Sequence, residues 1–437
     1  MKNDRDLMHP DQRGKTQAFP ALINQLTFRN EVILVIIIVA VAFGLRLGYL
    51  FASHSWDKAP NYDGIEYDIL ATNLARGDGY SLQTGVPYGF RPPGFPFYMS
   101  ILYAIFGPSA AVVRLFNIFL STLTCVPVYL FAKGLWGKPT ALIAALGVGL
   151  HPLLIYFNGL IYPESLMLFL ISVALLFGYY AMTSGSLKWV FLVGLVSAAL
   201  VYLRPNLIIF SFGHLVWIWL VFKNNKRRVL AGSILIGVQI LVILPWSLRN
   251  YQVFDKFVWM STNGGTTLWA GNNPLADGGW IEPSPTTWQD PDPPADLRGW
   301  PGLSETENEA RFQDKAMAWI RAHPGTFLSL MPRKLYRAWG LNFGNESRDI
   351  AMPKIVGLAY AVFVLVSLVG LIFSIPQWRY LIPVYMLIIT STFTTILYYG
   401  STRQTAILAP LTVSLAAYSV CWILSFTTTR LGARKVL

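Results

Sequence analysis

Long apolar runs are the feature that most limits what this 437-residue chain can fold into. A bilayer core about 30 Å thick needs a helix of about 20 apolar residues, and lipid offers no partner to an open backbone, so each crossing run must be helical. The ten predicted spans are residues 32–52, 110–132, 139–158, 165–182, 187–203, 205–222, 229–246, 354–374, 379–398 and 405–426. These runs predict an all-α polytopic membrane protein.

Composition excludes the main alternatives. Only 13% of the residues are charged, against about 25% in soluble domains, so a soluble enzyme and a disordered chain are both excluded. The two cysteines, Cys125 and Cys421, lie inside apolar runs, so no disulfide framework is expected.

Charge sets the predicted orientation. The net charge is +12, and basic residues collect in the cytosolic loops of membrane proteins. The basic residues fall in cytosolic loops here if both termini are cytosolic and the short apolar segment Phe95–Phe106 stays on the outer surface. The Arg91-Pro92-Pro93-Gly94 turn that precedes this segment cannot lie inside a helix. The predicted cytosolic segments then hold the entire positive excess, which signals orientation and not a nucleic-acid partner.

Four regions follow from this topology. They are a cytosolic tail at 1–31, an N-terminal membrane module at 32–246 with a first outer loop at 53–109, a large outer loop at 247–353, and C-terminal helices with a short cytosolic tail at 354–437. A connection as long as the large outer loop is expected to be folded or functional.

The first outer loop combines a surface helix with charged residues. Its apolar residues recur at helical spacing and predict an amphipathic helix on the membrane surface, at Ile65, Ile69, Leu70 and Leu74. Asp63 precedes this helix, where its carboxylate could cap the helix or take part in chemistry. Arg91, in the proline turn, could bind a phosphate or carboxylate with its planar fork, or serve as an interfacial anchor.

More arginines stand at the predicted outer helix ends, against the usual charge bias. They are Arg46, Arg114, Arg204, Arg249 and Arg403. Burying an arginine without a partner in the membrane costs at least about 2.5–3.5 kcal/mol, so each either reaches water, pairs with a carboxylate or joins a shared anion site. Glu164 is the only acidic residue between Asp78 and Asp255, and it is predicted to face the same compartment.

The large outer loop carries amide side chains and two predicted helices. Asn272 and Asn273 lie in a Gly- and Trp-containing stretch of a kind that binds sugars, although turns use the same residues. Glu309–His323 and Phe327–Trp339 are predicted interfacial helices, and the basic residues of the second are expected at lipid headgroups or a lipid phosphate: Arg333, Lys334 and Arg337. The five histidines are scattered and form no metal-binding pattern.

These motifs resemble the GT-C membrane glycosyltransferases. The resemblance is greatest to the family 39 type, which includes protein O-mannosyltransferases and the aminoarabinose transferase of lipid A. It rests on Asp63…Glu66-Tyr67…Gly77-Asp78, Arg91-Pro92-Pro93, Pro245-Trp246…Arg249-Asn250, Gly271-Asn272-Asn273-Pro274 and His323-Pro324-Gly325.

The resemblance implies a role for each matching residue. Asp63 would be the base for an acceptor hydroxyl, with Glu164 as a second catalytic carboxylate. The residues implied at the donor phosphate are Arg91, Arg204, Arg249 and Arg403, and those implied at the acceptor or sugar are Glu66, Tyr67, Asn272 and Asn273. Two positions depart from the family: Glu164 stands where relatives often have Asp, and Gln404 where they often have Tyr.

The expected function is transfer of a sugar from a polyprenyl-phosphate-linked donor to an acceptor hydroxyl. The reaction is expected on the outer face of the plasma membrane, on a lipid, glycan or protein acceptor, beside membrane lipids and without nucleic acid. No cofactor is expected, and the use of a divalent metal stays open. Two alternatives are a lipid-linked sugar flippase or transporter, which predicts inverted repeats, and a polymerase or ligase of surface glycans.

Overall fold

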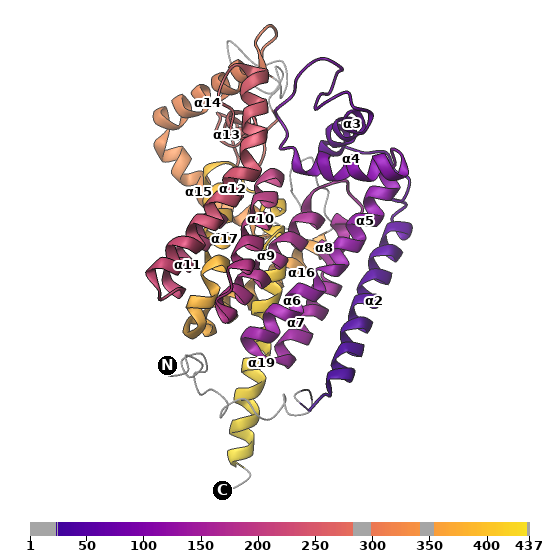
Figure 1. The fold of residues 1–437 in the computed structure, drawn as a ribbon, viewed down its shortest axis with the longest axis vertical. Coiled ribbons are helices and arrows are strands. Elements are labelled where there is room, and N and C mark those ends of the chain that lie inside the picture. Colours follow the sequence, from indigo (N-terminus) through magenta and orange to yellow (C-terminus); the bar gives the residue numbers. More distant parts are fainter. Residues whose placement is uncertain (1–22, 24, 283–298, 341–353, 435–437) are drawn as a thin grey trace.

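The computed structural model describes residue 23 and residues 25–282, 299–340 and 354–434. These residues form helices joined by turns and loops, with an isolated bridge between Gln83 and Val86, and they contain no strand. The long helices run side by side as a bundle, and the start of α2 (Phe28–Ala52) lies at the same end of it as the end of α19 (Ala409–Arg434) (Figure 1). The all-α membrane class is therefore confirmed.

Seven of the described helical segments are long and apolar enough to cross a bilayer. They are α2; α5 (Ala110–Leu123) continued by α6 (Cys125–Trp136); α9 (Glu164–Ser184); α12 (Asn225–Phe254); α16 (Lys354–Phe373); η3 (Ile375–Gln377) continued by α17 (Trp378–Leu397); and α19.

The other three predicted spans contain shorter apolar helices. They are α7 (Lys138–Leu150) followed by α8 (Pro152–Phe157); α10 (Leu187–Leu203); and η2 (Pro205–Leu207) continued by α11 (Ile208–Val221). Each falls short of the length that a perpendicular span requires. A total of ten spans thus stays a prediction.

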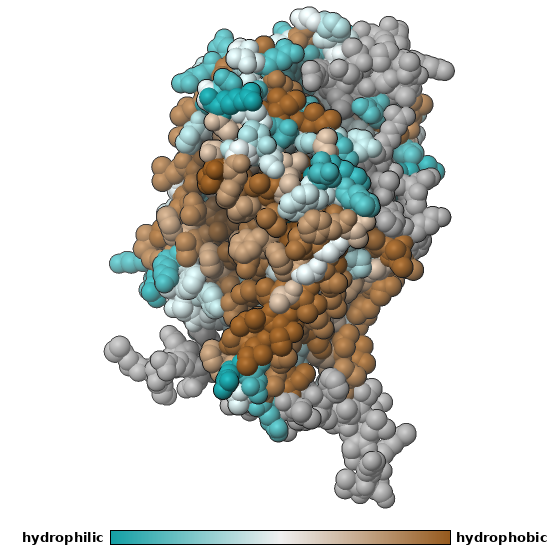
Figure 2. Space-filling view, turned by 90° about the vertical axis from the view of Figure 1, so that its right-hand side faces the viewer, coloured by the Kyte–Doolittle hydropathy of each residue, from teal (hydrophilic) through white to brown (hydrophobic). Residues whose placement is uncertain are grey.

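The outer surface of the bundle is apolar, as lipid contact requires. Figure 2 shows apolar side chains over the middle and lower part of one face, with polar side chains gathered at the top. Large exposed apolar residues occur on several long helices, for example Ile36 of α2, Leu241 of α12 and Ile372 of α16. Inside the bundle, α16 and α19 approach so closely that a Cβ at Gly370 would lie 2.0 Å from the Leu415 carbonyl oxygen.

Two helices run across one end of the bundle instead of along it. They are α3 (Asp63–Arg76) and α4 (Gly94–Phe106), which lie side by side (Figure 1). The arrangement agrees with the prediction that Phe95–Phe106 does not cross. Helix α4 buries Phe95 and Met99 while Ile101 stays exposed, so it has one protein-facing and one free side.

The predicted amphipathic helix is present as α3, and its two sides differ in burial. Tyr67, Leu70 and Ala71 are buried, whereas Ile65 and Ile69 are exposed. The apolar spacing thus indicated the helix, and it did not specify which residues pack on the protein. The two exposed isoleucines leave α3 an apolar side of its own.

The large outer loop folds into a small helical unit, as its length predicts. It contains α13 (Gly264–Gly271), α14 (Glu305–Ala322) and α15 (Pro324–Ala338), packed around Trp269, Phe312 and Trp319. Both predicted interfacial helices are present. Helix α14 begins earlier than predicted because Ser304 and Glu307 form a capping box. The N-terminal tail 1–22 and the proline-rich run 291–296 lie outside the described residues.

Two of the outer arginines serve the fold. Buried Arg46 donates to the Ser121 hydroxyl at 3.0 Å and to the Gly149 carbonyl at 2.6 Å, which ties α2 to α5 and α7. Arg114 donates to the carbonyls of Gly159 at 3.1 Å and Trp56 at 3.2 Å. Both guanidinium groups thus donate hydrogen bonds to backbone carbonyl oxygens and not to an anion.

Candidate active site

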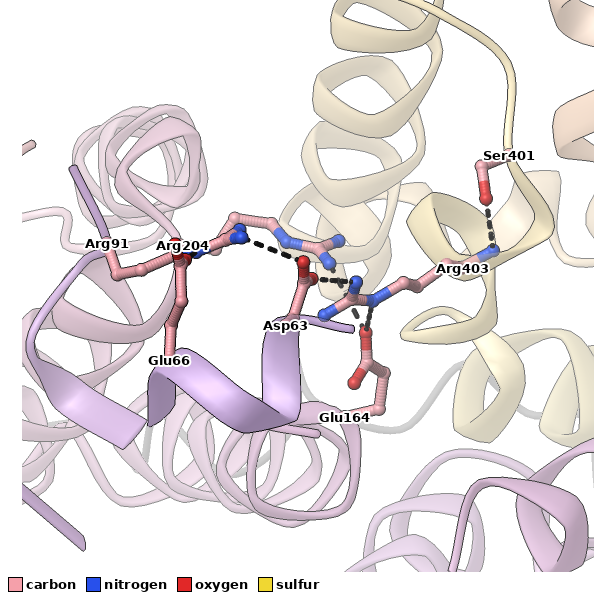
Figure 3. A network of polar contacts seen from close by, with 7 residues as sticks. All are labelled: Asp63, Glu66, Arg91, Glu164, Arg204, Ser401 and Arg403. Atoms are coloured by element: carbon pink, nitrogen blue, oxygen red, sulfur yellow. Dashed lines mark hydrogen bonds and ion pairs between the residues drawn. The ribbon is translucent and has the colours of Figure 1, made fainter. Parts of the chain in front are cut away.

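Six charged side chains from distant parts of the chain meet at the end of the bundle where α3 begins (Figure 3). Asp63 and Glu66 belong to the first turn of α3, Glu164 is the first residue of α9, and Arg204 caps the C-terminus of α10. Arg91 precedes α4, and Arg403 lies in α18 (Thr402–Ala406). The carboxylates stand at helix N-termini and Arg204 at a C-terminus, the ends whose dipoles favour those charges.

Asp63 lies between two arginines. Its Oδ1 is 2.9 Å from an Arg91 nitrogen and its Oδ2 is 2.5 Å from an Arg403 nitrogen. Burial acts to raise the pKa of Asp63, but the two guanidinium groups outweigh burial and lower that pKa to about 2. The residue at the cap of α3 is Tyr62, and its side chain makes no capping hydrogen bond. The Asp63 carboxylate therefore binds two arginines and is not the N-cap of α3.

Arg403 joins the two predicted catalytic carboxylates. One guanidinium nitrogen contacts Asp63, Nε donates to Glu164 Oε1, and the guanidinium lies 4.0 Å from the centre of the Tyr162 ring. Burial lowers the pKa of Arg403, but both carboxylates more than reverse that effect and raise it well above its usual value. Arg403 is thus held charged and in one orientation.

Glu164 is fully buried but only half used. Its Oε1 accepts from Arg403 and lies 3.6 Å from Arg204, whereas its Oε2 accepts no hydrogen bond from any described residue. A buried carboxylate oxygen without a donor is costly. This oxygen therefore keeps unused hydrogen-bonding capacity inside the site.

Arg91 is fixed by a second carboxylate and by aromatic rings. Its Nε lies 2.5 Å from Glu66 Oε2, which also accepts a hydrogen bond from the Tyr88 hydroxyl at 3.2 Å. The guanidinium lies 5.3 Å from the centre of the Phe90 ring and 5.8 Å from that of Tyr67. Glu66 and Tyr67 thus orient Arg91 as the structure stands, and their predicted contact with acceptor or sugar stays a prediction.

The cluster balances its own charge. Three carboxylates face three guanidinium groups: Asp63, Glu66 and Glu164 against Arg91, Arg204 and Arg403. As the structure stands, the formal charges of the cluster cancel.

The other predicted phosphate ligand, Arg249, has a separate set of partners. It donates to the Tyr88 carbonyl at 2.8 Å and the Tyr80 carbonyl at 3.2 Å, and it stacks on Trp246. These contacts tie α12 to the loop that carries Arg91. The structure thus gives Arg249 a supporting place beside the cluster, and its contact with phosphate stays a prediction.

Asn272 and Asn273 lie away from the cluster and are fully buried. The Asn272 amide nitrogen donates to carbonyls of Leu268 and Leu397, and the Asn273 amide nitrogen donates to those of Trp269 and Ala270. Both amides are occupied by the protein, which is the turn role that the sequence left open for them. The structure lends no support to a sugar contact by either.

Two contributors were missed in the sequence. The Glu305 carboxylate accepts hydrogen bonds from the Thr262 hydroxyl and, at 2.9 Å, from the Gly89 backbone, which anchors the loop before Arg91 to α14. Lys334, predicted at lipid headgroups, is buried instead, so that prediction is wrong for this residue. No local pattern marks either, because their partners are far away in sequence.

The described part of the chain contains no group of three His, Cys, Asp or Glu side chains placed to hold a metal ion. The carboxylates of the cluster contact guanidinium groups and do not contact each other.

Comparison with known proteins concerns the fold and the family that the chain resembles. Residues 90–248 match the family model of dolichyl-phosphate-mannose-protein mannosyltransferases. The archaeal oligosaccharyltransferase of Archaeoglobus fulgidus, solved with an inhibitory peptide and a dolichol-phosphate, superposes with a TM-score of 0.54 and 14% identity over 93% of this chain and 52% of its own. The chain has the fold of the GT-C glycosyltransferases. The apo form of the same archaeal GT-C enzyme gives a TM-score of 0.55 at 13% identity, over the same 93% and 52%.

A curated relative supports the same GT-C resemblance in sequence. The undecaprenyl phosphate-alpha-4-amino-4-deoxy-L-arabinose arabinosyl transferase of Pseudomonas paraeruginosa is 25% identical over 239 residues, which is 51% of this chain and 42% of that protein. The chain thus matches less than half the length of this relative. The family match includes Arg91, Glu164 and Arg204, whereas Asp63 and Arg403 lie outside the matched residues.

Proposed function

We propose that this protein transfers a sugar from a polyprenyl-phosphate-linked donor to an acceptor hydroxyl, at the outer face of the plasma membrane. The observation that carries the proposal is the cluster in which Asp63 and Glu164 share Arg403, with Arg91 on the other side of Asp63. One similar protein is named for undecaprenyl phosphate, and another was solved in complex with a dolichol-phosphate.

The location of the cluster suits a lipid-linked donor. It lies at the end of the bundle where α3 and α4 run across it (Figure 1), and polar side chains gather at that end of the face drawn in Figure 2. A polyprenyl chain would stay in the bilayer while its phosphate meets the arginines at headgroup level. The start of α2 and the end of α19 would then lie on the cytosolic side. The N-terminal module would supply Asp63 to the reaction, and the C-terminal helices would supply Arg403.

The reaction would be a single displacement. The acceptor oxygen attacks the anomeric carbon, the bond from that carbon to the phosphate oxygen breaks, and its electron pair leaves with the phosphate. The hydroxyl proton passes to a carboxylate of the site. Guanidinium groups aimed at the departing phosphate stabilise the charge that gathers there.

Donor binding would also prepare the base. In the structure both Asp63 oxygens are bound by arginine and its pKa is about 2, so Asp63 is a weak proton acceptor. A donor phosphate that draws Arg91 and Arg403 toward itself would free Asp63 and raise its pKa. Glu164, with one oxygen already free of donors, could meanwhile accept a hydrogen bond from the acceptor hydroxyl.

Reconstituted protein tests this proposal directly. Proteoliposomes with a radiolabelled undecaprenyl-phosphate sugar and a membrane extract as the source of acceptor should release undecaprenyl phosphate and form a labelled product. Movement of intact donor between leaflets without bond cleavage would instead identify a flippase, and growth of a long glycan would identify a polymerase or ligase. Transfer unchanged in Asp63→Ala would refute the role of Asp63.

A further inference from the structure

The segment that carries Arg403 has little structure of its own. Helix α17 ends at Leu397, the chain turns at residues 398–401, and α18 is only five residues long. A helix of this length is not stable alone in water. Whatever places Arg403 between Asp63 and Glu164 must therefore lie outside the segment.

The large outer loop holds this segment at several points. The Gly400 backbone donates to the Gly278 carbonyl at 2.8 Å, the Thr402 hydroxyl to the Arg337 carbonyl at 3.3 Å, and the Thr405 hydroxyl to the Ala338 carbonyl. All three acceptors belong to the stretch between α13 and the end of α15. The Arg403 segment is thus held by hydrogen bonds to the helical unit of α13, α14 and α15, called the outer unit below.

The packing at this contact leaves no room for side chains. A Cβ at Gly271 would lie 1.9 Å from the Tyr398 carbonyl oxygen, and one at Gly400 would lie 2.0 Å from the Lys334 carbonyl oxygen. Real Cβ atoms do not come so close, so the two backbones touch directly. A small shift of the outer unit would therefore be passed on to the Arg403 segment.

Lys334 lies at the centre of this contact. It is fully buried, and its Nζ donates to Asn272 Oδ1 at 2.7 Å, to the Ile396 carbonyl at 3.1 Å and to the Leu397 carbonyl at 3.5 Å. Burial lowers the pKa of Lys334 to about 7, and no described carboxylate forms an ion pair with it. Its partners are the last carbonyls of α17, which no helical N–H can satisfy.

Asn272 completes the connection. While its oxygen accepts from Lys334, its amide nitrogen donates to the Leu397 carbonyl at 2.9 Å and to the Tyr398 carbonyl at 3.4 Å. Lys334 and Asn272 thus bind the same helix end, immediately before the turn to Arg403. Without them, the terminal carbonyls of α17 would be buried and unpaired.

We propose that Lys334 is a positioning residue, which through Asn272 and the end of α17 sets Arg403 between Asp63 and Glu164. The proposal rests on the proposed function for its effect on catalysis. Its structural core, the coupling of Lys334 to the Arg403 segment, stands on the contacts alone. The outer unit then contributes to the site by holding one of its arginines.

A double-mutant cycle tests the coupling. Lys334→Met, Arg403→Gln and the double variant are compared with the wild type for their affinity for undecaprenyl phosphate in detergent. Lys334→Met should weaken binding about tenfold in the wild-type background and less than about twofold when Arg403 is already replaced. Equal losses in the two backgrounds would overturn the proposal. Lys256→Met removes the same side chain at an exposed position and should change neither affinity.

Hydrogen exchange separates this proposal from the proposed function. Backbone amides of residues 398–406 should exchange faster in Lys334→Met than in the wild type, at least about tenfold, while those of α9 keep their rates. Equal exchange of residues 398–406 would overturn the proposal, whether or not the protein transfers sugar. If Lys334→Met does not fold, Thr405→Val removes one hydroxyl from the same contact and should give the smaller change in the same peptides.

Discussion

At the scale of single residues, Asp63 and Arg403 show how the clustered charges hold one another. Asp63 is bound by Arg91 and Arg403 through separate oxygens, so its charge is stabilised and its basicity is low. Arg403 is bound in turn by Glu164. Each charge is therefore placed by its partners.

Replacing Asp63 should therefore separate catalysis from donor binding. In Asp63→Asn, Arg91 keeps Glu66 and Arg403 keeps Glu164 as partners, and both arginines lose a competitor for the donor phosphate. We expect kcat to fall by about 10²–10⁴-fold, with a KM for the donor that does not rise. Steady-state kinetics with varied donor measure both. Asp78→Asn, an exposed carboxylate in a turn, should have neither effect, and a raised donor KM in Asp63→Asn would contradict the exchange of partners.

At the scale of secondary-structure elements, the key polar contacts lie at the ends of helices. Carboxylates stand at the beginnings of α3 and α9, and Lys334 meets the end of α17. Helix α13 is capped from another element, because Glu309 of α14 accepts from the Gly265 backbone at 2.6 Å and from the Thr266 backbone at 3.4 Å. These contacts join elements whose order along the chain does not predict their contact.

The capping of α13 by Glu309 should make stability depend on pH. Burial raises the pKa of Glu309 to about 7, although the backbone hydrogen bonds lower it. The folded protein then binds a proton more tightly than the unfolded chain, so this residue's contribution to stability is lost as pH rises from about 4.5 to about 7. Melting temperature followed over this range should fall in the wild type and fall less in Glu309→Gln. An identical pH dependence in both would show that the Glu309 carboxylate does not titrate there.

The junction of α4 and α10 offers a test of packing. A Cβ at Gly94 would lie 2.7 Å from the Tyr202 backbone, so Gly94→Ala should push α4 away and cost about 1–3 kcal/mol. The melting temperature in detergent measures the loss, and donor affinity should fall with it because Arg91 precedes this helix. Gly325→Ala, where a Cβ meets no atom within 4 Å, is the matched control. Equal melting temperatures for the two variants would contradict the close approach.

At the scale of the whole molecule, the two ends of the bundle differ. One end carries α3, α4 and the outer unit with the charged cluster, and the other carries the start of α2 and the end of α19 (Figure 1). We predict that the cluster end faces the cell exterior, since the basic loops belong at the opposite end.

Cysteine labelling measures this orientation. Thr84→Cys lies in the exposed loop before Arg91, and Lys226→Cys lies in the exposed, basic first turn of α12. In intact bacterial cells, a membrane-impermeant maleimide should label Thr84→Cys at once and Lys226→Cys only after permeabilisation. The reverse pattern would invert the protein in the membrane and exclude an outer active site. The unsubstituted protein, whose Cys125 is buried, sets the background.

The membrane class, the positions of most helices and the identity of the clustered residues could all be predicted from the sequence. The reason is physical: burial in lipid imposes long apolar runs, and prolines and caps mark helix ends locally. The same local patterns located Asp63, Glu164 and Arg403 as charges at unusual places. They did not show that Tyr67 of α3 packs inward while the more apolar Ile65 stays exposed, because the neighbours decide which side is covered.

By itself, then, the sequence determined that this chain is a helical membrane protein with unusual charges at helix ends. Only the tertiary structure decided which charges pair. Arg403 meets a carboxylate 340 positions away, and Lys334 meets Asn272 from 62 positions away. A pairing energy depends on the distance between atoms and on burial, and neither is a property of a stretch of sequence. The fold alone therefore turned Arg403 toward Asp63 and Glu164, and Arg46 and Arg114 toward backbone carbonyls.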